Sequence, residues 1–476
     1  MLTIVIPAAA VGLLAFLMMP LRAQALIAFL LMTQLLDVAP SVLFGMYVWD
    51  YGAVLMLIVG IRVYFMKPMV TPRAHGYMIV LRLLICWVVV CFLWSLLVNG
   101  YPLDHTIKAA RRLLVGYPMA LIFARLFCVD PDSFDYLLKW LYRFTLVLMP
   151  VALLQYVVQR PLLFGLFRDY EGSLRSLPVF LPLCLLNGWI ISAKLLSGAR
   201  TSWHEMCYLL LAMASVVLSF TRGIYLAVLL AGALLLFLMS RERQLRPGAI
   251  LRLSLAAFPV LALLLFTGMG QRVGERTLSA LHLVGGDTAA VTSKDLDDSY
   301  HGRLDLAGER FQLAFHRNPL MGFGFIHEDD VPPELRSQLR YGSVLSGGAA
   351  NPDAYANLYA TSDRYLLAFY SADIAWADIA ITTGTVGIAL LVALLLALAA
   401  DYWRHPNDSH PLGYPVRIGL FLQTLVMFIL MFDGDNFFGT VHIPLFLLAG
   451  YSLVGIRTQR DEAPALPAFK PANLLT

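Results

Sequence analysis

Apolar runs long enough to cross a lipid bilayer recur along almost the whole chain of 476 residues. A membrane-spanning helix needs about 20 consecutive, mostly apolar residues, which few soluble domains contain even once. The hydrophobic share of 59% and the charged share of 14% also lie outside the range of soluble domains. The runs lie near residues 3–19, 24–43, 45–66, 77–98, 112–128, 140–159, 177–195, 205–221, 223–239, 250–268, 374–400, 416–432 and 437–455. We therefore predict an all-α fold, a polytopic bundle of about 12–13 transmembrane helices.

Net charge and cysteine usage exclude several other classes of protein. A net charge of +4 is too small for a nucleic-acid binder, and a disordered chain has few apolar residues. The five cysteines all lie inside apolar runs without metal-ligand spacing, at Cys86, Cys91, Cys128, Cys184 and Cys207. An odd number of cysteines in such runs argues against a disulfide framework or a zinc site.

The distribution of basic residues predicts the orientation of the chain, because connections rich in Lys and Arg stay in the cytoplasm. The first apolar run leads past Arg22 straight into a second one, so we interpret it as a retained span rather than a signal peptide. One set of connections holds 19 Lys and Arg, whereas the other short connections hold seven. The richer set, assigned to the cytoplasm, comprises Arg22, residues 62–82, 125–143, 194–200, 241–252 and 404–417, and the tail from Arg457.

One long hydrophilic stretch, residues 271–370, holds 22 of the 66 charged residues and falls outside the cytoplasm in this orientation. Structureless loops longer than about 12–15 residues are uncommon, so we expect this loop to be largely helical. The predicted organisation is N-terminal transmembrane helices in residues 1–270, a loop domain in 271–373, C-terminal transmembrane helices in 374–456 and a cytoplasmic tail in 457–476.

Within the loop, the apolar pattern of residues 303–317 predicts a helix. Asn318-Pro319 ends that helix, and the glycines of the following MGFGF predict a tight turn. The later segment 341–363 is rich in small, polar and aromatic residues, which is typical of an ordered loop over a site. The apolar face of the predicted helix comprises Leu304, Ala307, Phe311, Ala314 and Phe315.

Several basic residues remain on the side that the charge rule keeps poor in cations. Arg222 lies in a very short connection between two spans, where it either snorkels to the headgroups or binds a lipid-linked phosphate bidentately. Each of the others alone can be a solvated loop charge. Together they predict a cationic surface at the membrane border, made of Lys108, Arg111 and Arg112 on one helical face, Arg168 and Arg175 around a turn, Arg222 and Arg303.

The acidic candidates lie where the loop meets the next span. Asp373 and Asp378 flank Trp376 at the start of the apolar run 374–400. A carboxylate there either caps a helix N-terminus or takes part in chemistry, and an ionisable group inside a span is a functional candidate by default. Trp376 and the nearby tyrosines offer flat faces for sugars, or form an interfacial aromatic belt. The loop histidines His301, His316 and His327 have no paired partner at catalytic spacing.

These motifs resemble the O-antigen ligase and Wzy-type polysaccharide polymerase superfamily. The span–span turn S-x-x-R-G at Arg222 is similar to that of the family, and GRLDLAGERFQLAFHRNPLMGFGF resembles its arginine, helix and N-P-L-x-G-x-G pattern. The segment ending ITTGTVG resembles the last loop helix, which leads into a span through a G-x-x-G step. RDYEGSLRSLP is similar to a weaker basic element, and the resemblance covers about residues 100–400.

The resemblance implies a bacterial inner-membrane glycosyltransferase that acts at the periplasmic face on an undecaprenyl-diphosphate-linked sugar, with inversion and without a metal or cofactor. Arg222 and Arg303 would bind the diphosphate. Asp373 stands where ligases of the family commonly have the histidine proposed as base, which favours a polymerase of an exported polysaccharide over a ligase. Membrane lipid, a chain-length regulator and a flippase are the implied partners. The remaining substrate-binding candidates are Lys108, Arg111, Arg112, Arg168, Arg175, Trp376 and Asp378.

Two classes other than an enzyme stay open on the sequence alone. A polysaccharide or lipid-linked sugar transporter would share the spans and the cations. It should show internal repeats and polar or broken helices at mid-membrane, and it has no need of a 100-residue external loop. A non-catalytic assembly subunit would share the loop, but it has no reason to place phosphate-binding arginines at the membrane border.

Overall fold

The computed structural model describes residues 11–32, 42–43, 46–69, 76–158, 167–170, 173–176, 181–219, 222–241, 248, 307–327, 330–332, 375–404 and 413–431. The spans predicted near 250–268 and 437–455 lie outside these residues. So do most of the loop 271–370 and the tail from Arg457. The boundaries of the four predicted regions therefore stay predictions.

The described chain is a bundle of α-helices with two short antiparallel hairpins, which confirms the predicted all-α class. The elements are α2 (Leu21–Met32), β1 (Val42–Leu43), β2 (Met46–Tyr47), α3 (Val48–Phe65), α4 (Gly76–Leu97), α5 (Leu103–Val129), α6 (Asp132–Val158), β3 (Phe167–Tyr170), β4 (Ser173–Ser176), α7 (Leu181–Leu196), α8 (Trp203–Leu218), α9 (Arg222–Arg241), α16 (Ala375–Arg404) and α17 (Gly413–Leu430). Residues 11–18 and 307–317 are also helical.

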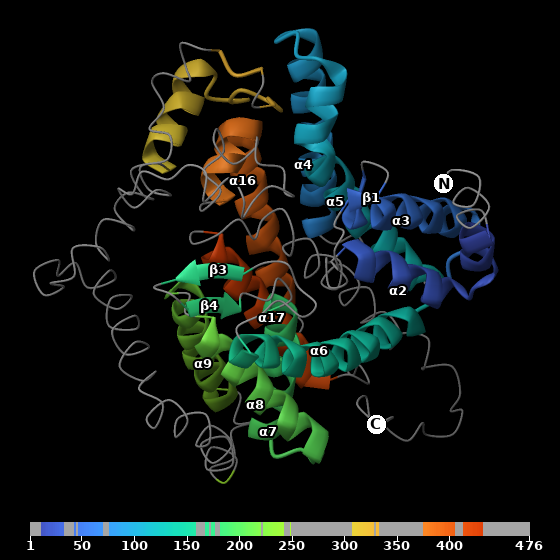
Figure 1. Ribbon diagram of the computed structural model, residues 1–476, viewed down its shortest axis with the longest axis vertical. Helices are drawn as coiled ribbons and strands as arrows, with labels where there is room; N and C mark the ends of the chain where they lie inside the picture. Colours follow the sequence, from blue (N-terminus) through green and yellow to red (C-terminus); the bar gives the residue numbers. More distant parts are fainter. Residues whose placement is uncertain are drawn as a thin grey trace, which may run out of the picture.

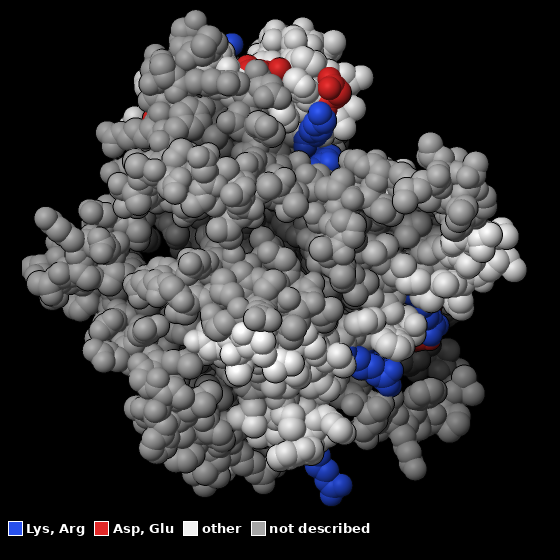
Figure 2. Space-filling view, viewed as in Figure 1, with Lys and Arg blue, Asp and Glu red and all other residues white. Residues whose placement is uncertain are grey.

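Four of the described helices are long and apolar enough to cross a membrane, within α4, α6, α9 and α16. A fifth is present if the two arms of α5, which meet at a bend of 48°, form one span. Large apolar side chains face outward, with Leu97 79% exposed and Phe65 80% exposed. On the face that Figure 2 shows, acidic and basic groups occupy only small parts of the described surface. These features are those of a multi-pass membrane protein; the total of 12–13 spans stays a prediction.

The helices pack in two groups that α16 and α6 connect (Figure 1). In one group α3 lies against α2 and α5, and α4 lies against α5 and α16. In the other, α17 packs against α7 and α9, and α8 packs against α6 and α7. The ring of Trp376 at the start of α16 meets Phe428 near the end of α17, at 5.4 Å between centroids. Helices α16 and α17 therefore run antiparallel, as expected for consecutive spans.

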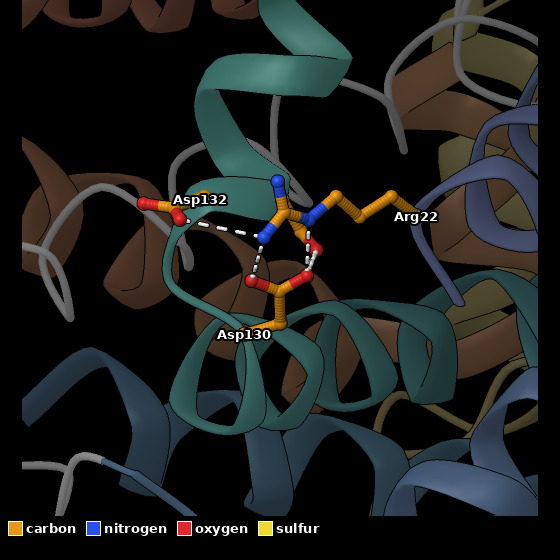
Figure 3. Close-up of polar contacts among 4 residues, drawn as sticks. Arg22, Asp130 and Asp132 are labelled. Carbon is orange, nitrogen blue, oxygen red and sulfur yellow. Dashed lines mark hydrogen bonds and ion pairs between the residues drawn. The ribbon is translucent and has the colours of Figure 1, made fainter. Parts of the chain in front are cut away.

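An ion-pair cluster joins the start of α2 to the turn between α5 and α6 (Figure 3). The Arg22 guanidinium contacts both carboxylate oxygens of Asp130, with Nε at 2.5 Å and Nη2 at 2.8 Å, and its Nη2 lies 3.3 Å from Asp132. Nearby, the Met69 amide donates to the carbonyl of Cys128. Three connections that the charge rule assigns to one side of the membrane therefore meet at one end of the bundle.

Local sequence also sets the start of α8. The Ser202 hydroxyl accepts the Glu205 amide, and Glu205 in return accepts the Ser202 amide at 2.6 Å, which is a capping box. The second oxygen of this fully buried Glu205 lies 2.7 Å from Nζ of Lys194 on α7. One carboxylate thus begins a helix and also joins it to its neighbour.

Candidate functional site

The glycine-rich segment after the loop helix forms a tight turn, as predicted. The helix over 307–317 ends at Asn318, whose side-chain oxygen accepts the amides of Leu320 and Met321 at 3.1 and 3.2 Å. Gly322 and Gly324 then adopt φ of 63° and 75°, a left-handed conformation that other residues rarely adopt. Residues 318–327, called the docked turn below, therefore owe their shape to one asparagine and two glycines.

The docked turn binds to a break in α16. Gly384 has φ 63° and ψ −163° inside that helix, which frees backbone groups on both sides of it. The Phe323 amide donates to the carbonyl of Ile381 at 2.8 Å. The amide and the hydroxyl of Thr385 both donate to the carbonyl of Pro319, at 3.0 and 2.7 Å. The broken helix and the turn thus satisfy each other's backbone groups.

Glycine is required where these two segments touch. A Cβ atom on Gly384 would collide with the carbonyl oxygen of Leu320, and one on Gly322 would collide with the carbonyl oxygens of Ala380 and Ile381. The N-P-L-x-G-x-G and G-x-x-G motifs, which are separate in the sequence, are therefore two halves of one contact. This contact explains physically why both motifs contain glycine.

Helix α4 holds the docked turn from the other side. The Phe325 amide donates to the buried hydroxyl of Ser95 at 2.7 Å, and Asn99 Nδ2 donates to the carbonyl of Phe323 at 2.8 Å. The Trp87 indole donates to the carbonyl of Thr383 beside the break in α16, at 2.9 Å. The turn is therefore wedged between α4 and α16, and it joins the loop to the membrane helices.

The described part of the loop helix buries the predicted face except for Phe315, and it also buries Arg310. Phe311 packs against the hydrophobic core, as expected. Ala307 and Ala314 are buried as expected, but Phe315 is 39% exposed and Arg310 is only 1% exposed. Residues 307, 310 and 314 follow one helical stripe, and Phe315 lies beyond its edge. The sequence analysis missed Arg310, although an arginine at the spacing of the two buried alanines was a signal for it.

Asp378 and Trp376 lie within the helix packing. Asp378, in the first turn of α16, is 1% exposed, and Trp376 is 5% exposed. Ala314 of the loop helix clusters with Ala380 and Ile381 of α16, so the buried charges Arg310 and Asp378 belong to two elements that pack together. Because so little of Trp376 and Asp378 reaches the surface, we leave both out of the proposed sugar-binding surface.

The cationic residues of α5 do not share one straight face. The helix bends by 48° between its arms Leu103–Arg111 and Leu113–Val129, and Arg112 lies at the junction. Lys108 is exposed, whereas Arg111 lies 3.2 Å from Asp50 of α3. The prediction of a shared face assumed a continuous helix. Lys108 is thus the one of this trio that the structure describes as an exposed cation.

The other predicted residues are described only in part. Arg222 is the first residue of α9, so its backbone lies at the end of a candidate span. The register of the β3–β4 hairpin pairs Arg168 directly with Arg175, so the backbones of these two residues lie side by side on neighbouring strands. The side chains of these three arginines and of Arg112 lie outside the described residues, as do Arg303 and Asp373 altogether.

Two histidines that are far apart in the sequence lie together in the structure. His327, which has no paired partner at catalytic spacing in the sequence, is 8% exposed, and its ring stacks on that of His105 at 4.7 Å between centroids. His105 also contacts Asp330, which lies 225 positions away in the sequence. Contacts at such separations leave no local pattern, so the sequence analysis missed both residues.

The geometry defines the class: a polytopic α-helical membrane protein in which a loop segment is bound into the break of a span. Residues 207–392 match the family model of the O-antigen ligases, Wzy_C. The match runs from α8 and α9 through the loop helix and the docked turn into α16, and it confirms the resemblance to the O-antigen ligase and Wzy-type superfamily. This similarity supports a membrane glycosyltransferase of the ligase or polymerase kind. The curated proteins give no match.

Gly384→Ala is expected to destabilise the protein by about 2–4 kcal/mol, because alanine is strained at this φ and ψ and its Cβ meets the docked turn. Thermal unfolding of the purified protein in detergent measures the loss. Gly232→Ala in α9 is the matched control, since nothing lies within 4 Å of its Cβ position, and it should not lower the unfolding temperature. Equal stability of the two variants would contradict the contact described here.

Proposed function

We propose that this protein polymerises undecaprenyl-diphosphate-linked oligosaccharide repeat units into an exported polysaccharide. The supporting observation is the contact between the docked turn and the break in α16, because it unites the two glycine motifs inside the matched segment 207–392. Lipid-linked oligosaccharides are the substrates of that family. A contact that ties an external loop to a span suits an enzyme whose substrate is anchored in the membrane.

The proposed reaction is a displacement at the anomeric carbon of the lipid-linked sugar. The acceptor hydroxyl oxygen forms the new C–O bond, its proton passes to the carboxylate of Asp373, and the bond from the anomeric carbon to the diphosphate breaks with inversion. Arg222 and Arg303 neutralise the charge that develops on the diphosphate, the part that a metal ion plays in other transferases. Asp373 precedes the first residue of α16 by two positions, so a short link joins it to the segment that the docked turn holds.

The polar arm of α5 and the β3–β4 hairpin supply the remaining proposed contacts to substrate. Lys108, Arg112, Arg168 and Arg175 would attract the lipid-linked diphosphate along the membrane border, whereas Arg111 is already engaged by Asp50. A flippase that delivers the repeat unit and a chain-length regulator are the proposed partners. The active site faces the periplasm in this proposal.

Two alternatives remain, each with its own discriminating feature. An O-antigen ligase would transfer the finished glycan to a lipid or protein acceptor. Ligases of the family usually have a histidine at the position of Asp373, so the carboxylate found here favours a polymerase. A transporter would move the lipid-linked sugar without forming a glycosidic bond.

Purified protein in proteoliposomes, supplied with undecaprenyl-diphosphate repeat units alone, is the decisive experiment. A ladder of lengthening lipid-linked glycans supports the polymerase. Transfer that occurs only after a separate acceptor is added would establish the ligase instead. Substrate translocation with no new glycosidic bond would sink both and favour the transporter.

The orientation is tested separately. With the loop 271–370 in the periplasm, a cysteine at Ser343 should react with a membrane-impermeant maleimide in intact spheroplasts, in a background without the five native cysteines. The basic asymmetry between the two sets of connections motivates this expectation. A cysteine placed in the tail after Arg457 should react only after lysis, and the reverse pattern would invert the topology.

A further inference from the structure

A cluster of ionisable side chains joins the first arm of α5 to the far end of the docked turn. His105 Nδ1 lies 3.0 and 3.1 Å from the two carboxylate oxygens of Asp330. The His105 ring stacks on His327 with an angle of 27° between the ring planes. The side chains of His105 and Asp330 are 24% and 13% exposed. The pair is therefore in contact with water but largely shielded from it. No part of the proposed chemistry uses these residues.

The arm that carries His105 lies outside the apolar part of the helix. Residues Leu103–Arg111 include four ionisable groups and are set off by the bend from the apolar arm Leu113–Val129. On its own arm His105 faces Asp104, 3.7 Å from Nε2, and Lys108. From the loop it faces Asp330 and His327. The half-buried Tyr101 lies within the influence of the charges of both Asp330 and Arg317. An amphipathic arm of this kind belongs at the membrane surface.

The anchors of the loop on α4 and α5 differ in chemistry. Ser95 and Asn99 hold the middle of the turn through hydrogen bonds to uncharged backbone groups. The contact between His105 and Asp330 is the anchor among these that changes with protonation of a side chain. The segment that it holds is also bound to α16 next to Gly384. The docked turn therefore links His105 to the break in α16.

We propose that His105 is a positioning residue which, as an imidazolium bound to Asp330, locks the docked turn against α5 and so keeps the start of α16 in its active position. This inference rests on the proposed function only for its effect on turnover. The lock itself is a property of the fold. It makes the geometry of the site depend on the pH of the compartment that the loop faces.

The sign of the pH dependence follows from the contact. The hydrogen bond that His105 donates to Asp330 raises the pKa of His105 above the ordinary value of 6.5, and the charge of Asp104 acts in the same direction. A group whose pKa is raised on docking stabilises the docked form fully below its free value. That contribution is lost as pH rises through the raised pKa. The turn should therefore loosen as pH rises through this raised pKa, and turnover should decline with it.

Amide hydrogen exchange of residues 318–331, measured by mass spectrometry on the full protein in nanodiscs, tests the lock without any assay of activity. In the wild type we expect the protection factor of this segment to fall on the order of tenfold as pH rises past the His105 transition. In His105→Gln, whose amide still donates to Asp330, protection should be the same at all pH values. Asp330→Asn, which removes the carboxylate that His105 binds, should also abolish the pH dependence of protection.

Asn99→Ala is the matched control, because it removes an uncharged anchor of the same turn. Its protection should be lower than that of the wild type by a constant factor, and the pH dependence should persist. The alkaline limb of kcat/KM should vanish in His105→Gln and remain in Asn99→Ala. Unchanged pH dependence of exchange in both His105→Gln and Asp330→Asn would overturn the lock. If the wild-type protein shows the expected pH dependence of exchange but forms no polymer, the proposed function is refuted and the lock is not.

Discussion

Asp373→Asn is expected to abolish polymer formation almost completely while the protein still folds, inserts and binds its lipid-linked substrate. Proton transfer by a placed side chain contributes roughly 10²–10⁴-fold to a rate, and asparagine cannot accept the proton of the acceptor hydroxyl. Asparagine keeps the shape of aspartate and caps a helix N-terminus about equally well, so a mere cap should tolerate the change within about 1 kcal/mol. The rate of chain lengthening on purified repeat units separates the two roles.

The variant Asp378→Asn is to be compared with Asp373→Asn in the same assay. Since Asp378 is 1% exposed within the helix packing, we expect this change to lower the unfolding temperature. Turnover per folded molecule should remain. Near-normal polymer with Asp373→Asn and loss with Asp378→Asn would move the base to Asp378. Full activity in both variants would remove the carboxylate mechanism.

Arg222→Lys is expected to weaken binding of the diphosphate substrate by about 2–5 kcal/mol, and Arg303→Lys should behave in the same way. A lysine provides a point charge but cannot form the two parallel hydrogen bonds of a guanidinium. Arg222 is also the first residue of α9, where unpaired helical amides already favour an anion. Equilibrium binding of undecaprenyl diphosphate to the purified variants measures the loss.

The matched control is Arg241→Lys, at the opposite end of the same helix. It should bind the lipid diphosphate as well as the wild type does, because the proposed site lies at the other end of α9. Wild-type binding and a normal polymerisation rate in Arg222→Lys would show that Arg222 only snorkels to the headgroups. Loss in both variants would indicate a general need for arginine in α9 rather than a phosphate site.

Local chemistry in the sequence predicts the parts of the site that depend on neighbours along the chain. Asn318, Pro319 and the two glycines predict the helix end and the tight turn, because each acts within a few residues of itself. Apolar periodicity likewise predicts the helix class of the fold. The match of the family model over residues 207–392 bears out the resemblance drawn from the same motifs.

The remaining features depend on partners that no local pattern reveals. Ser95 lies 230 positions from the amide that it binds, and in the sequence it is one serine in an apolar run. Arg111 of α5 pairs with Asp50 of α3, 61 positions away, and no local pattern in the sequence indicates that pairing. Charged residues are expected on the exposed face of a helix, but Arg310 lies on the buried face, where apolar residues are expected.

The cluster of Arg22, Asp130 and Asp132 has a consequence for how the chain is built into the membrane. Asp130 follows Arg22 by 108 positions, so the ribosome delivers the cation long before its partner exists. In the predicted orientation, this cation would help to keep the first connection in the cytoplasm during that interval, since orientation follows Lys and Arg and acidic residues contribute little. After α5 and α6 are inserted, the same guanidinium binds Asp130 and Asp132 and joins α2 to the turn between these helices. One side chain would thus act first in orienting the chain and then in holding its helices together.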